Sequence, residues 1–292
     1  NTPAFEAEIS GSNPGGAANF FPSFYDPATH FIDPLADARV YYRQYGDQVM
    51  QAAAREVFGV YALILAGGKG ERLRPLTDSL PKPMVPLCGK PILEHQVEWL
   101  KSGGVTDVVF LAGYRWEAIK DYFGDGSAFG IDAHYSVEDS PLGRGGAIKA
   151  GFPEVPENEN TVVVLNGDTI TDETLNNLLA YHQARKLANE SHLASIMVVP
   201  MVSPYGLVDF DQAGTVTSFR EKVETEHWIN AGIYLFERSI AGELPDLGDH
   251  ETETFPRLAE AGQLAARKSL SFWRSVDSFK DLKEAEEHVG SR

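Results

Sequence analysis

The chain has 292 residues, of which 43% are hydrophobic, and it carries 25 basic against 42 acidic residues, a net charge of −17 at pH 7. A surface this acidic repels nucleic acids and anionic lipids, so neither is expected as a partner. Cys88 is the single cysteine, which excludes an intrachain disulfide and a cysteine-based metal site. No apolar run approaches the ~18 residues that span a bilayer, and no signal peptide is visible, so we expect a cytoplasmic protein without membrane contact.

Residues 1–58 differ in pattern from the rest of the chain. Their first part contains turn formers and aromatic residues without a steady period. Apolar side chains then recur every three or four residues, which predicts one amphipathic helix. This face comprises Tyr42, Tyr45, Val49, Ala53 and Val57. We therefore predict an N-terminal extension over 1–58, docked on its own catalytic domain or on a partner subunit, and a second domain over 59–292.

From Val60 onward, short apolar runs alternate with helix-like segments. The predicted strands are 61–67, 107–113, 131–138, 161–168, 194–202, 206–211, 216–222 and 230–237. The predicted helices are 91–104, 117–126, 144–152, 172–190 with Asp172 as its N-cap, 255–262 and 278–289. Strand and helix alternate first, and hairpin-like strands follow. This order predicts an α/β fold, a Rossmann-like mixed, mostly parallel sheet flanked by helices with added antiparallel strands.

A glycine-rich loop follows the first buried strand, where open α/β sheets bind ligands. Five basic residues stand against two acidic ones between Lys69 and Lys90, which indicates an anion site within an acidic protein. A P-loop would place Ser or Thr after its Gly-Lys pair, but Gly70 follows Lys69. The dinucleotide fingerprint would need a third glycine where Leu73 stands. Neither familiar phosphate loop fits.

The stretches "LAGGKGERLRPLT" (65–77) and "PKPMVPLCGKPIL" (81–93) resemble the signature of the sugar-1-phosphate nucleotidyltransferases, also called nucleotide-sugar pyrophosphorylases. Further matching stretches follow in the order of that family, and they cover roughly residues 60 to 289. They are "LGRGGAI" (142–148), "VLNGD" (164–168), "PYGLVDFD" (204–211), "FREK" (219–222), "NAGIYLF" (230–236) and "FPRLAEAG" (255–262). The resemblance implies transfer of a nucleoside monophosphate from a nucleoside triphosphate to a sugar 1-phosphate, with release of pyrophosphate.

The resemblance also implies roles for individual residues. Arg72, Lys82 and Lys222 would be catalytic, because they can neutralise phosphate charge during the transfer. The nucleotide-binding residues would be Leu65, Ala66, Gly67, Gly68, Gly70, Glu71, Arg72 and Gly143. The sugar-phosphate-binding residues would be Gly146, Glu221, Lys222, Asn230 and Gly232. Arg144 stands where many relatives have Thr and is expected to face solvent, and Glu138 is expected to be a surface charge rather than a base-binding group.

Magnesium is the implied cofactor, held by Asp168 and Asp277. Relatives commonly carry the second carboxylate two residues after a Trp, but Ser275 occupies that position after Trp273. Asp277 lies two residues further and has the same side-chain parity on an extended strand, so we assign the metal role to it. The rival interpretation is that Asp277 only caps the helix that begins near Phe279.

Several alternatives stay open at the level of the sequence. The product is expected to be a GDP-manno-sugar, with a UDP-, dTDP- or CDP-glucose type as the alternative. A non-catalytic nucleotide-sugar-binding relative would be expected to lack Arg72, Lys82 or Asp168, and all three are present. A glycosyltransferase would typically use an Asp-x-Asp metal pair, and that spacing occurs here only within "PYGLVDFD". The nucleoside triphosphate and sugar 1-phosphate are the expected partners, and a homo-oligomer is possible.

Overall fold

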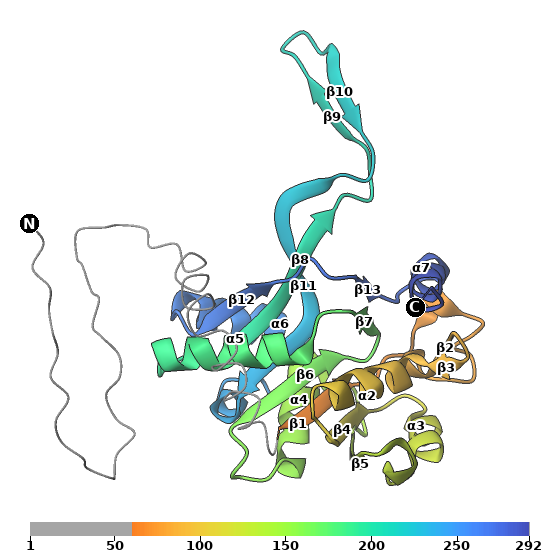
Figure 1. Cartoon of the computed structure of the whole chain (residues 1–292), viewed down its shortest axis with the longest axis vertical. Helices are drawn as coiled ribbons and strands as arrows, with labels where there is room; N and C mark the ends of the chain where they lie inside the picture. The colour runs from red at the N-terminus through yellow and green to blue at the C-terminus, as the bar shows by residue number, and fades with distance from the viewer. Residues whose placement is uncertain (1–59, 292) are drawn as a thin grey trace, which may run out of the picture. The chain divides into compact units, whose positions relative to one another are not determined.

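We analysed a computed structural model of the chain, which describes residues 60–291. The extension 1–58 and its predicted helix therefore lie outside the described residues, and the boundary predicted after residue 58 stays a prediction. The central element is a seven-stranded sheet in the order β12-β8-β11-β6-β1-β4-β5 (Figure 1). Its strands are β1 (Tyr61–Leu65), β4 (Asp107–Ala112), β5 (Asp132–Val137), β6 (Thr161–Asn166), β8 (Ala194–Val202), β11 (Glu224–Glu237) and β12 (Leu264–Lys268).

The sheet is mixed and mostly parallel, as the alternation of strands and helices predicted. β1 pairs in parallel with β4 and β6, and β4 pairs in parallel with β5. β11 runs antiparallel between β6 and β8, and β12 is parallel to β8. The carboxyl ends of β5, β4, β1 and β6 therefore lie side by side, followed by the early half of β11. This row of strand ends is where open α/β sheets bind ligands.

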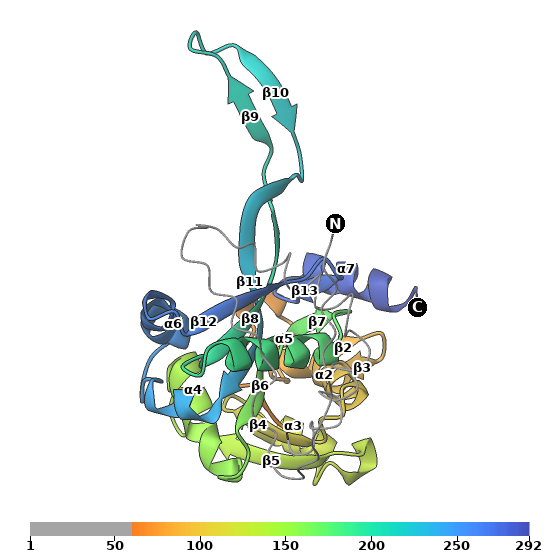
Figure 2. The ribbon, with the colours of Figure 1, turned by 60° about the vertical axis from the view of Figure 1, so that its left-hand side comes forward.

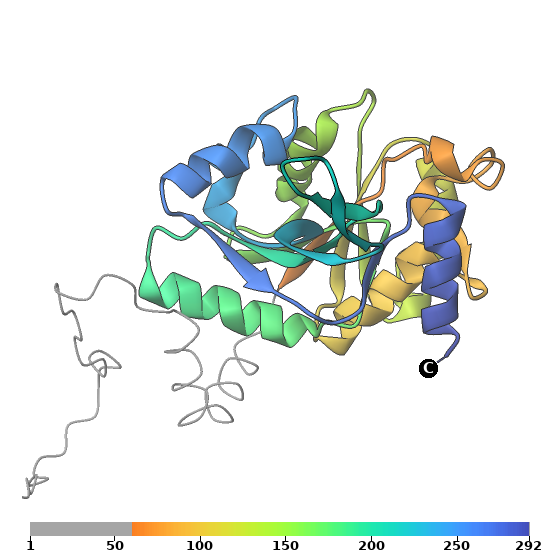
Figure 3. The same ribbon diagram turned by 90° about the horizontal axis from the view of Figure 1, so that it is seen from above.

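Helices cover both faces of the sheet because each presents an apolar stripe to it (Figure 3). The helices are α2 (Ile92–Ser102), α3 (Trp116–Phe123), α4 (Gly143–Gly151), α5 (Leu175–Ala188), α6 (His250–Glu260) and α7 (Phe279–Val289). α2, α3 and α5 contribute buried residues such as Leu100, Phe123 and Leu178 to one core. α4 and α6 contribute Ile148 and Leu258 to the core on the other face.

A third, smaller core brings the two ends of the described chain together. Leu73 and Val85 from the segment after β1 pack with Leu282 and Ala285 of α7. The short strands β2 (Pro86–Leu87) and β3 (Lys90–Pro91) lie in the same segment. β7 (Thr169–Thr171), directly after β6, pairs antiparallel with β13 (Trp273–Ser275). This pairing carries the chain after β13 to the carboxyl end of β6.

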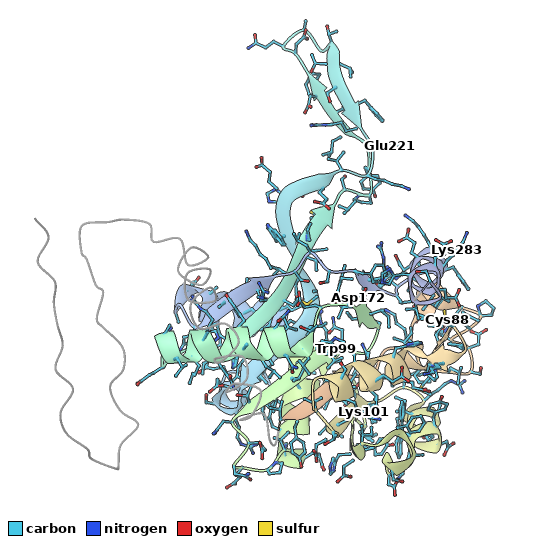
Figure 4. The ribbon with its side chains drawn as sticks, viewed as in Figure 1. Cys88, Trp99, Lys101, Asp172, Glu221 and Lys283 are labelled. Carbon is cyan, nitrogen blue, oxygen red and sulfur yellow. The ribbon has the colours of Figure 1, made fainter. Side chains whose placement is uncertain are left out.

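The helix predicted over 172–190 begins later than expected. α5 starts at Leu175 with Thr174 at the N-cap position, so Asp172 is not its cap. The physical reason is that β7 reaches Thr171 and the backbone N–H of Asp172 donates to the carbonyl of Phe272, so residue 172 is still held beside the segment that leads into β13. The Asp172 carboxylate lies 2.7 Å from Nε2 of His288 in α7, and Figure 4 labels Asp172 beside β7.

β9 (Leu207–Phe210) and β10 (Val216–Arg220) form a separate two-stranded sheet. This hairpin extends beyond the ends of β8 and β11, away from the helix layers (Figures 1 and 2). β10 ends at Arg220, two residues before the predicted end of the strand. Lys222 has a φ of 53°, the left-handed conformation of turns, so Glu221 and Lys222 lie in the turn that leads into β11.

Candidate active site

The glycine loop at the end of β1 is fixed by its contact with the segment around Lys82. Gly70 has a φ of 64°, and a Cβ added there would lie 2.7 Å from Cβ of Lys82. The Lys82 N–H donates to the Gly68 carbonyl at 3.2 Å, and the Thr77 hydroxyl donates to the Gly70 carbonyl at 2.8 Å. Only glycine fits position 70, because both the backbone conformation and the space exclude a side chain.

Lys82 joins the two aspartates to which the family resemblance gives the metal role. Its Nζ lies 2.5 Å from Oδ2 of Asp168 and 2.6 Å from Oδ1 of Asp277. Asp168 follows β6, and Asp277 follows β13, whose pairing with β7 brings the two carboxylates together. Nη2 of Arg72 lies 2.6 Å from the same Oδ1 of Asp277. Two basic and two acidic side chains from three segments, the one after β1, the one after β6 and the one after β13, thus form one charged cluster.

The cluster favours an ionised Asp277. Burial opposes ionisation, but the hydrogen bond from Lys82 and the charges of Lys82 and Arg72 outweigh it, so the pKa of Asp277 lies below its ordinary value. Two converging carboxylates supply the hard oxygen ligands that Mg²⁺ prefers, and their shared contact with an ammonium group shows that a cation fits between them. The residues present therefore fit a magnesium ion.

The structure contradicts the capping interpretation of Asp277, and its metal role stays a prediction. Ser278, not Asp277, is the N-cap of α7, since its side chain accepts the Asp281 N–H. Asp277 is therefore free of that capping role. Ser275, which stands where relatives commonly carry a carboxylate, donates from Oγ to Oδ2 of Asp277 at 3.1 Å. The serine thereby helps to orient the carboxylate that follows it.

A cavity of about 430 Å³ opens beside this cluster along the carboxyl ends of the strands. Its walls include seven of the residues predicted for the site, namely Leu65, Gly67, Gly68, Lys82, Gly143, Asp168 and Asp277. Further lining residues are Pro83, Leu111, Glu138, Pro141, Arg144, Ala147, Asn166, Gly167 and Ser275. Leu111 and Glu138 come from the β4–β5 side and Asn166 from the end of β6, so the cavity crosses the line of strand ends.

Glu138 is a fixed wall of the cavity and not a plain surface charge. Its Oε2 accepts the Leu142 N–H at 2.9 Å. A Cβ added to Gly67 would lie 3.0 Å from its Oε1, and one added to Gly113 would lie 2.7 Å from the same atom. Because these two positions have no side chain, there is room for the Glu138 carboxylate. Its oxygens therefore keep acceptor positions available for a ligand.

Arg144 is 40% exposed, but it is not the free solvent-facing side chain that was expected, because its guanidinium forms ion pairs. Its Nη1 lies 2.7 Å from Oε1 of Glu251, and its Nε and Nη2 both donate to Oδ2 of Asp249. The two acidic residues lie at the start of α6, more than 100 positions from Arg144 along the chain. The local sequence therefore gave no sign of these ion pairs.

The residues predicted for the sugar phosphate do not all lie at the cavity. Nδ2 of Asn230 donates to Glu251 at 3.0 Å and to the Tyr234 hydroxyl at 2.9 Å. Gly232 has a φ of 71°, and a Cβ there would lie 2.4 Å from Nδ2 of the cavity residue Asn166. Asn230 and Gly232 thus border the β6 end of the cavity without lining it.

Gly146 and the Glu221–Lys222 pair are more distant from the cavity walls. A Cβ at Gly146 would lie 2.6 Å from the Asp246 carbonyl, so this glycine permits close packing of α4 against the segment before α6. Glu221 lies on the hairpin side of the molecule (Figure 4), and neither it nor Lys222 lines the cavity. Ala66, Gly70, Glu71 and Arg72 belong to the loop beside the cavity but not to its lining. The roles of all these residues stay predictions.

Sequence reasoning missed Asn166 and Ser275 as cavity residues. Asn166 lies inside the "VLNGD" stretch, two residues before Asp168, which was the available signal. Its carbonyl accepts from Nε2 of Gln96 at 2.7 Å, and the same Nε2 donates to the Thr169 carbonyl at 2.9 Å. The buried Gln96 therefore holds the backbone around Asp168 in place.

A second acidic group lies at the opposite ends of the strands. Within residues 60–291, Asp107, Asp132 and His134 form the one group of three potential metal ligands whose ligand atoms all lie within 4.8 Å of one another. Asp107 and Asp132 are the first residues of β4 and β5. This group is thus separated from the cavity by the length of the strands.

Comparison with known proteins identifies the class. A family model described as "Nucleotidyl transferase" matches residues 61–292, and the chain belongs to this family. It is 34% identical over 231 residues to a mannose-1-phosphate guanylyltransferase of Mycobacterium tuberculosis, an alignment that covers 76% of this chain and 62% of that protein. It is 32% identical over 247 residues to a UTP–glucose-1-phosphate uridylyltransferase of Synechocystis, covering 79% of this chain and 63% of that protein. The chain thus spans about three fifths of the length of these relatives.

Solved structures agree with this class. HddC from Yersinia pseudotuberculosis superimposes with a TM-score of 0.61 at 27% identity, covering 79% of this chain and 99% of that one. A second structure of HddC, complexed with GMP-PN, gives a TM-score of 0.59 at 25% identity and the same coverage. Among the helices of residues 60–291, none has the length and apolar character needed to cross a membrane.

Proposed function

We propose that this chain transfers a nucleoside monophosphate from a nucleoside triphosphate to a sugar 1-phosphate, giving a nucleotide-sugar of the GDP-manno type and pyrophosphate. The observation that carries the proposal is the position of Lys82 between Asp168 and Asp277, at a cavity that also opens onto the glycine loop. A cation held between carboxylates beside free loop amides is suited to binding and neutralising phosphates.

The reaction needs charge neutralisation and alignment more than covalent chemistry. An oxygen of the sugar 1-phosphate forms a bond to the α-phosphorus, the bond from that phosphorus to the bridging oxygen breaks, and pyrophosphate leaves. The N–H groups of Gly68 to Glu71 and the Arg72 guanidinium would hold the triphosphate. Lys82 would contact the α-phosphate, where charge builds up in the transition state. Lys222 would bind the sugar phosphate from the hairpin side.

Asp168 and Asp277 would hold Mg²⁺, as their paired carboxylates suit a hard cation. When bound, the ion supplies positive charge that offsets the phosphate groups. The chain's own contribution is to orient both carboxylates and to favour ionisation of Asp277, whose pKa, despite its burial, is lowered by Lys82 and Arg72. Ser275 and Lys82 both donate to Asp277, which supports this arrangement.

Glu138 supports guanine as the base. The guanine edge presents N1–H and N2–H groups, two adjacent donors that one carboxylate can accept. Uracil and thymine present one donor between two carbonyls, which would meet the Glu138 carboxylate less favourably. The cavity places Glu138 on the β5 side, with Leu111 and Pro141 as apolar neighbours for a planar ring. The mannose-1-phosphate guanylyltransferase relative is consistent with this preference.

Uridylyl transfer to a glucose 1-phosphate is the second candidate, favoured by the uridylyltransferase relative. A matrix of the nucleoside triphosphates against several sugar 1-phosphates, with pyrophosphate release as the readout, tests both. We expect GTP with mannose 1-phosphate or a manno-heptose 1-phosphate to give the highest rate. Highest activity with UTP and glucose 1-phosphate would support the second candidate, and no pyrophosphate from any pair would reject both.

A further inference from the structure

We propose that Arg144 is a specificity-determining residue that donates a hydrogen bond to a hydroxyl oxygen of the sugar, and that Asp249 and Glu251 hold its guanidinium in position to do so. This inference rests on the proposed function and deepens it. Arg144 lines the cavity that contains Lys82 and Asp168. It is the only arginine among the cavity-lining residues that the structure describes.

The position of the guanidinium group places it on the sugar side of the cavity. Arg144 follows Glu138 by only six residues, yet its side chain reaches the start of α6 and not β5. Oε1 of Glu251 accepts from Arg144 and also from Asn230 of β11, at 2.7 and 3.0 Å. β11 neighbours β6 on the side opposite β1, whereas Glu138 follows β5 at the other end of the row. Arg144 and Glu138 thus belong to opposite ends of the cavity.

The hydrogen-bond inventory of Arg144 leaves donors for a ligand. A guanidinium group carries five N–H groups in a fixed plane. Three of them are used, one each on Nε and Nη2 toward Asp249 and one on Nη1 toward Glu251. One N–H remains on each of Nη1 and Nη2. Because arginine cannot accept a hydrogen bond, these two groups select for an oxygen lone pair.

The local charge favours a hydroxyl over a phosphate. One guanidinium stands beside two carboxylates, so the group has no surplus positive charge. A phosphate placed there would meet the Asp249 and Glu251 carboxylates as well as Arg144, whereas a neutral hydroxyl would not be repelled. In the proposed function the triphosphate has Lys82 and the loop, and the sugar phosphate has Lys222, which leaves Arg144 for the uncharged part of the substrate.

The surrounding hydrogen bonds make the arginine rigid. Asp249 uses Oδ1 to accept the Glu251 N–H as the N-cap of α6, and Oδ2 for Arg144. Oε1 of Glu251 also accepts from the hydroxyl of the fully buried Tyr234 at 2.9 Å. A donor that is already held in place loses little conformational freedom when it binds, and this improves discrimination between similar ligands.

The test compares Arg144→Ala and Arg144→Lys with the unchanged full-length chain, using pyrophosphate release on its best substrate pair. We expect Arg144→Ala to raise KM for the sugar 1-phosphate by about 10-fold or more, while KM for the nucleoside triphosphate changes less than about 2-fold. Arg144→Lys should not restore the sugar KM, because a single ammonium group cannot hydrogen-bond to both carboxylates and to the sugar oxygen at the same time. Arg257→Ala is the matched control, since Arg257 lies on α6, pairs with Glu243 of the preceding segment and does not line the cavity.

Monodeoxy analogues of the sugar 1-phosphate identify the hydroxyl. The unchanged chain should lose activity with the analogue that lacks the recognised hydroxyl, and Arg144→Ala should no longer distinguish that analogue from the full sugar. An unchanged sugar KM in Arg144→Ala, or an equal rise in both KM values, would overturn the inference while leaving the proposed function intact. Absence of pyrophosphate release by the unchanged chain would reject both together.

A thermal melt establishes whether Arg144→Ala is folded. If it is not, Glu251→Gln provides the second measurement, since its amide oxygen still accepts a hydrogen bond but the charge that holds Arg144 is removed. We expect an intermediate rise in the sugar KM for Glu251→Gln, with the triphosphate KM unchanged. A sugar KM equal to that of the unchanged chain would overturn the inference in this case as well.

Discussion

Ser275 donates a hydrogen bond to Asp277 at 3.1 Å, two residues along the same extended segment. Ser275 stands at the position where the family resemblance implies a metal carboxylate, and the acid it contacts takes part in the Lys82 cluster. Asp277, two residues further along the sequence, therefore reaches the cluster from a shifted position. Because side chains alternate along an extended segment, residues two positions apart point to the same face, and Ser275 and Asp277 are two positions apart.

If Asp277 holds magnesium, Asp277→Asn should raise the Mg²⁺ concentration for half-maximal activity by about 10-fold or more and slow turnover, because one hard anionic ligand becomes neutral. The measurement is a magnesium titration of pyrophosphate release. Ser275→Ala is the control, which should change the requirement much less because the carboxylate remains. An unaltered magnesium requirement in Asp277→Asn would rule out the metal role.

Removing either cation from the cluster should affect turnover more than folding. Arg72→Ala and Lys82→Ala are each expected to lower turnover by ~100-fold or more, the scale of losing one oriented donor in the transition state. Steady-state kinetics at saturating Mg²⁺ measures this, with circular dichroism to verify the fold. Near-normal turnover in one variant would exclude the role given to that residue.

The base preference should depend on the Glu138 carboxylate. Glu138→Gln replaces one acceptor oxygen by an NH₂ donor, so we expect kcat/KM for GTP to fall by about 10-fold or more relative to UTP. Asp139→Asn makes the same charge change at the exposed neighbouring position and serves as the control. If the two variants show the same GTP-to-UTP ratio, Glu138 does not select the base.

Two glycines of the loop offer a direct test of its geometry. Gly70→Ala should destabilise the protein by about 2 kcal/mol or more, since φ is 64° and the new Cβ would lie 2.7 Å from Lys82 Cβ. Gly68→Ala has no atom within 4 Å of the added Cβ, so its melting temperature should stay close to that of the unchanged chain. Thermal unfolding of the pair is the measurement, and equal melting temperatures would show that position 70 accommodates a side chain.

The buried His250 predicts a loss of stability in mild acid. Burial lowers its pKa to about 4, and neither ring nitrogen has a hydrogen-bond partner within residues 60–291. In the unfolded chain its pKa returns to about 6.5. The stability that depends on the neutral ring is therefore fully present above pH 6.5, and this part of the free energy of unfolding is lost as the pH falls toward 4. The loss attributable to this ring is on the order of 3 kcal/mol.

His250→Phe should therefore flatten the dependence of unfolding free energy on pH between about 7 and 4.5. A phenyl ring keeps the edge contacts with Phe255 and Tyr234 but cannot be protonated. Denaturant unfolding at several pH values measures the effect, and His227→Asn at an exposed position is the control. The same pH slope in His250→Phe and the unchanged chain would refute this explanation.

Local patterns were sufficient to predict the alternation of strands and helices and the loop after β1. The buried strand before Gly67 and the glycine loop after it can be recognised from residues that are near neighbours in the sequence. The same holds for the argument that favoured Asp277, which used only its two-residue distance from Ser275. Partners far along the chain were not predictable in this way. Arg144 was expected to face solvent, and its ion-pair partners lie more than 100 positions away, at Asp249 and Glu251. Asp172 was misassigned because its backbone N–H bonds to the carbonyl of Phe272, a distant partner beside the β7–β13 pairing.

The contact between Lys82 and Asp277 joins residues 195 positions apart, and β13 and α7, which carry Asp277 to the site, are among the last elements of the chain. During synthesis at roughly 5–20 residues per second, the glycine loop and β6 leave the ribosome many seconds before their acidic partner does. Throughout that interval Lys82 and Asp168 can pair with each other, but the second carboxylate is missing. The charged cluster would therefore be completed only after residue 277 has been made, more than 100 residues after Asp168, and a ribosome that stalls before that point would hold a chain with its glycine loop but without the second carboxylate.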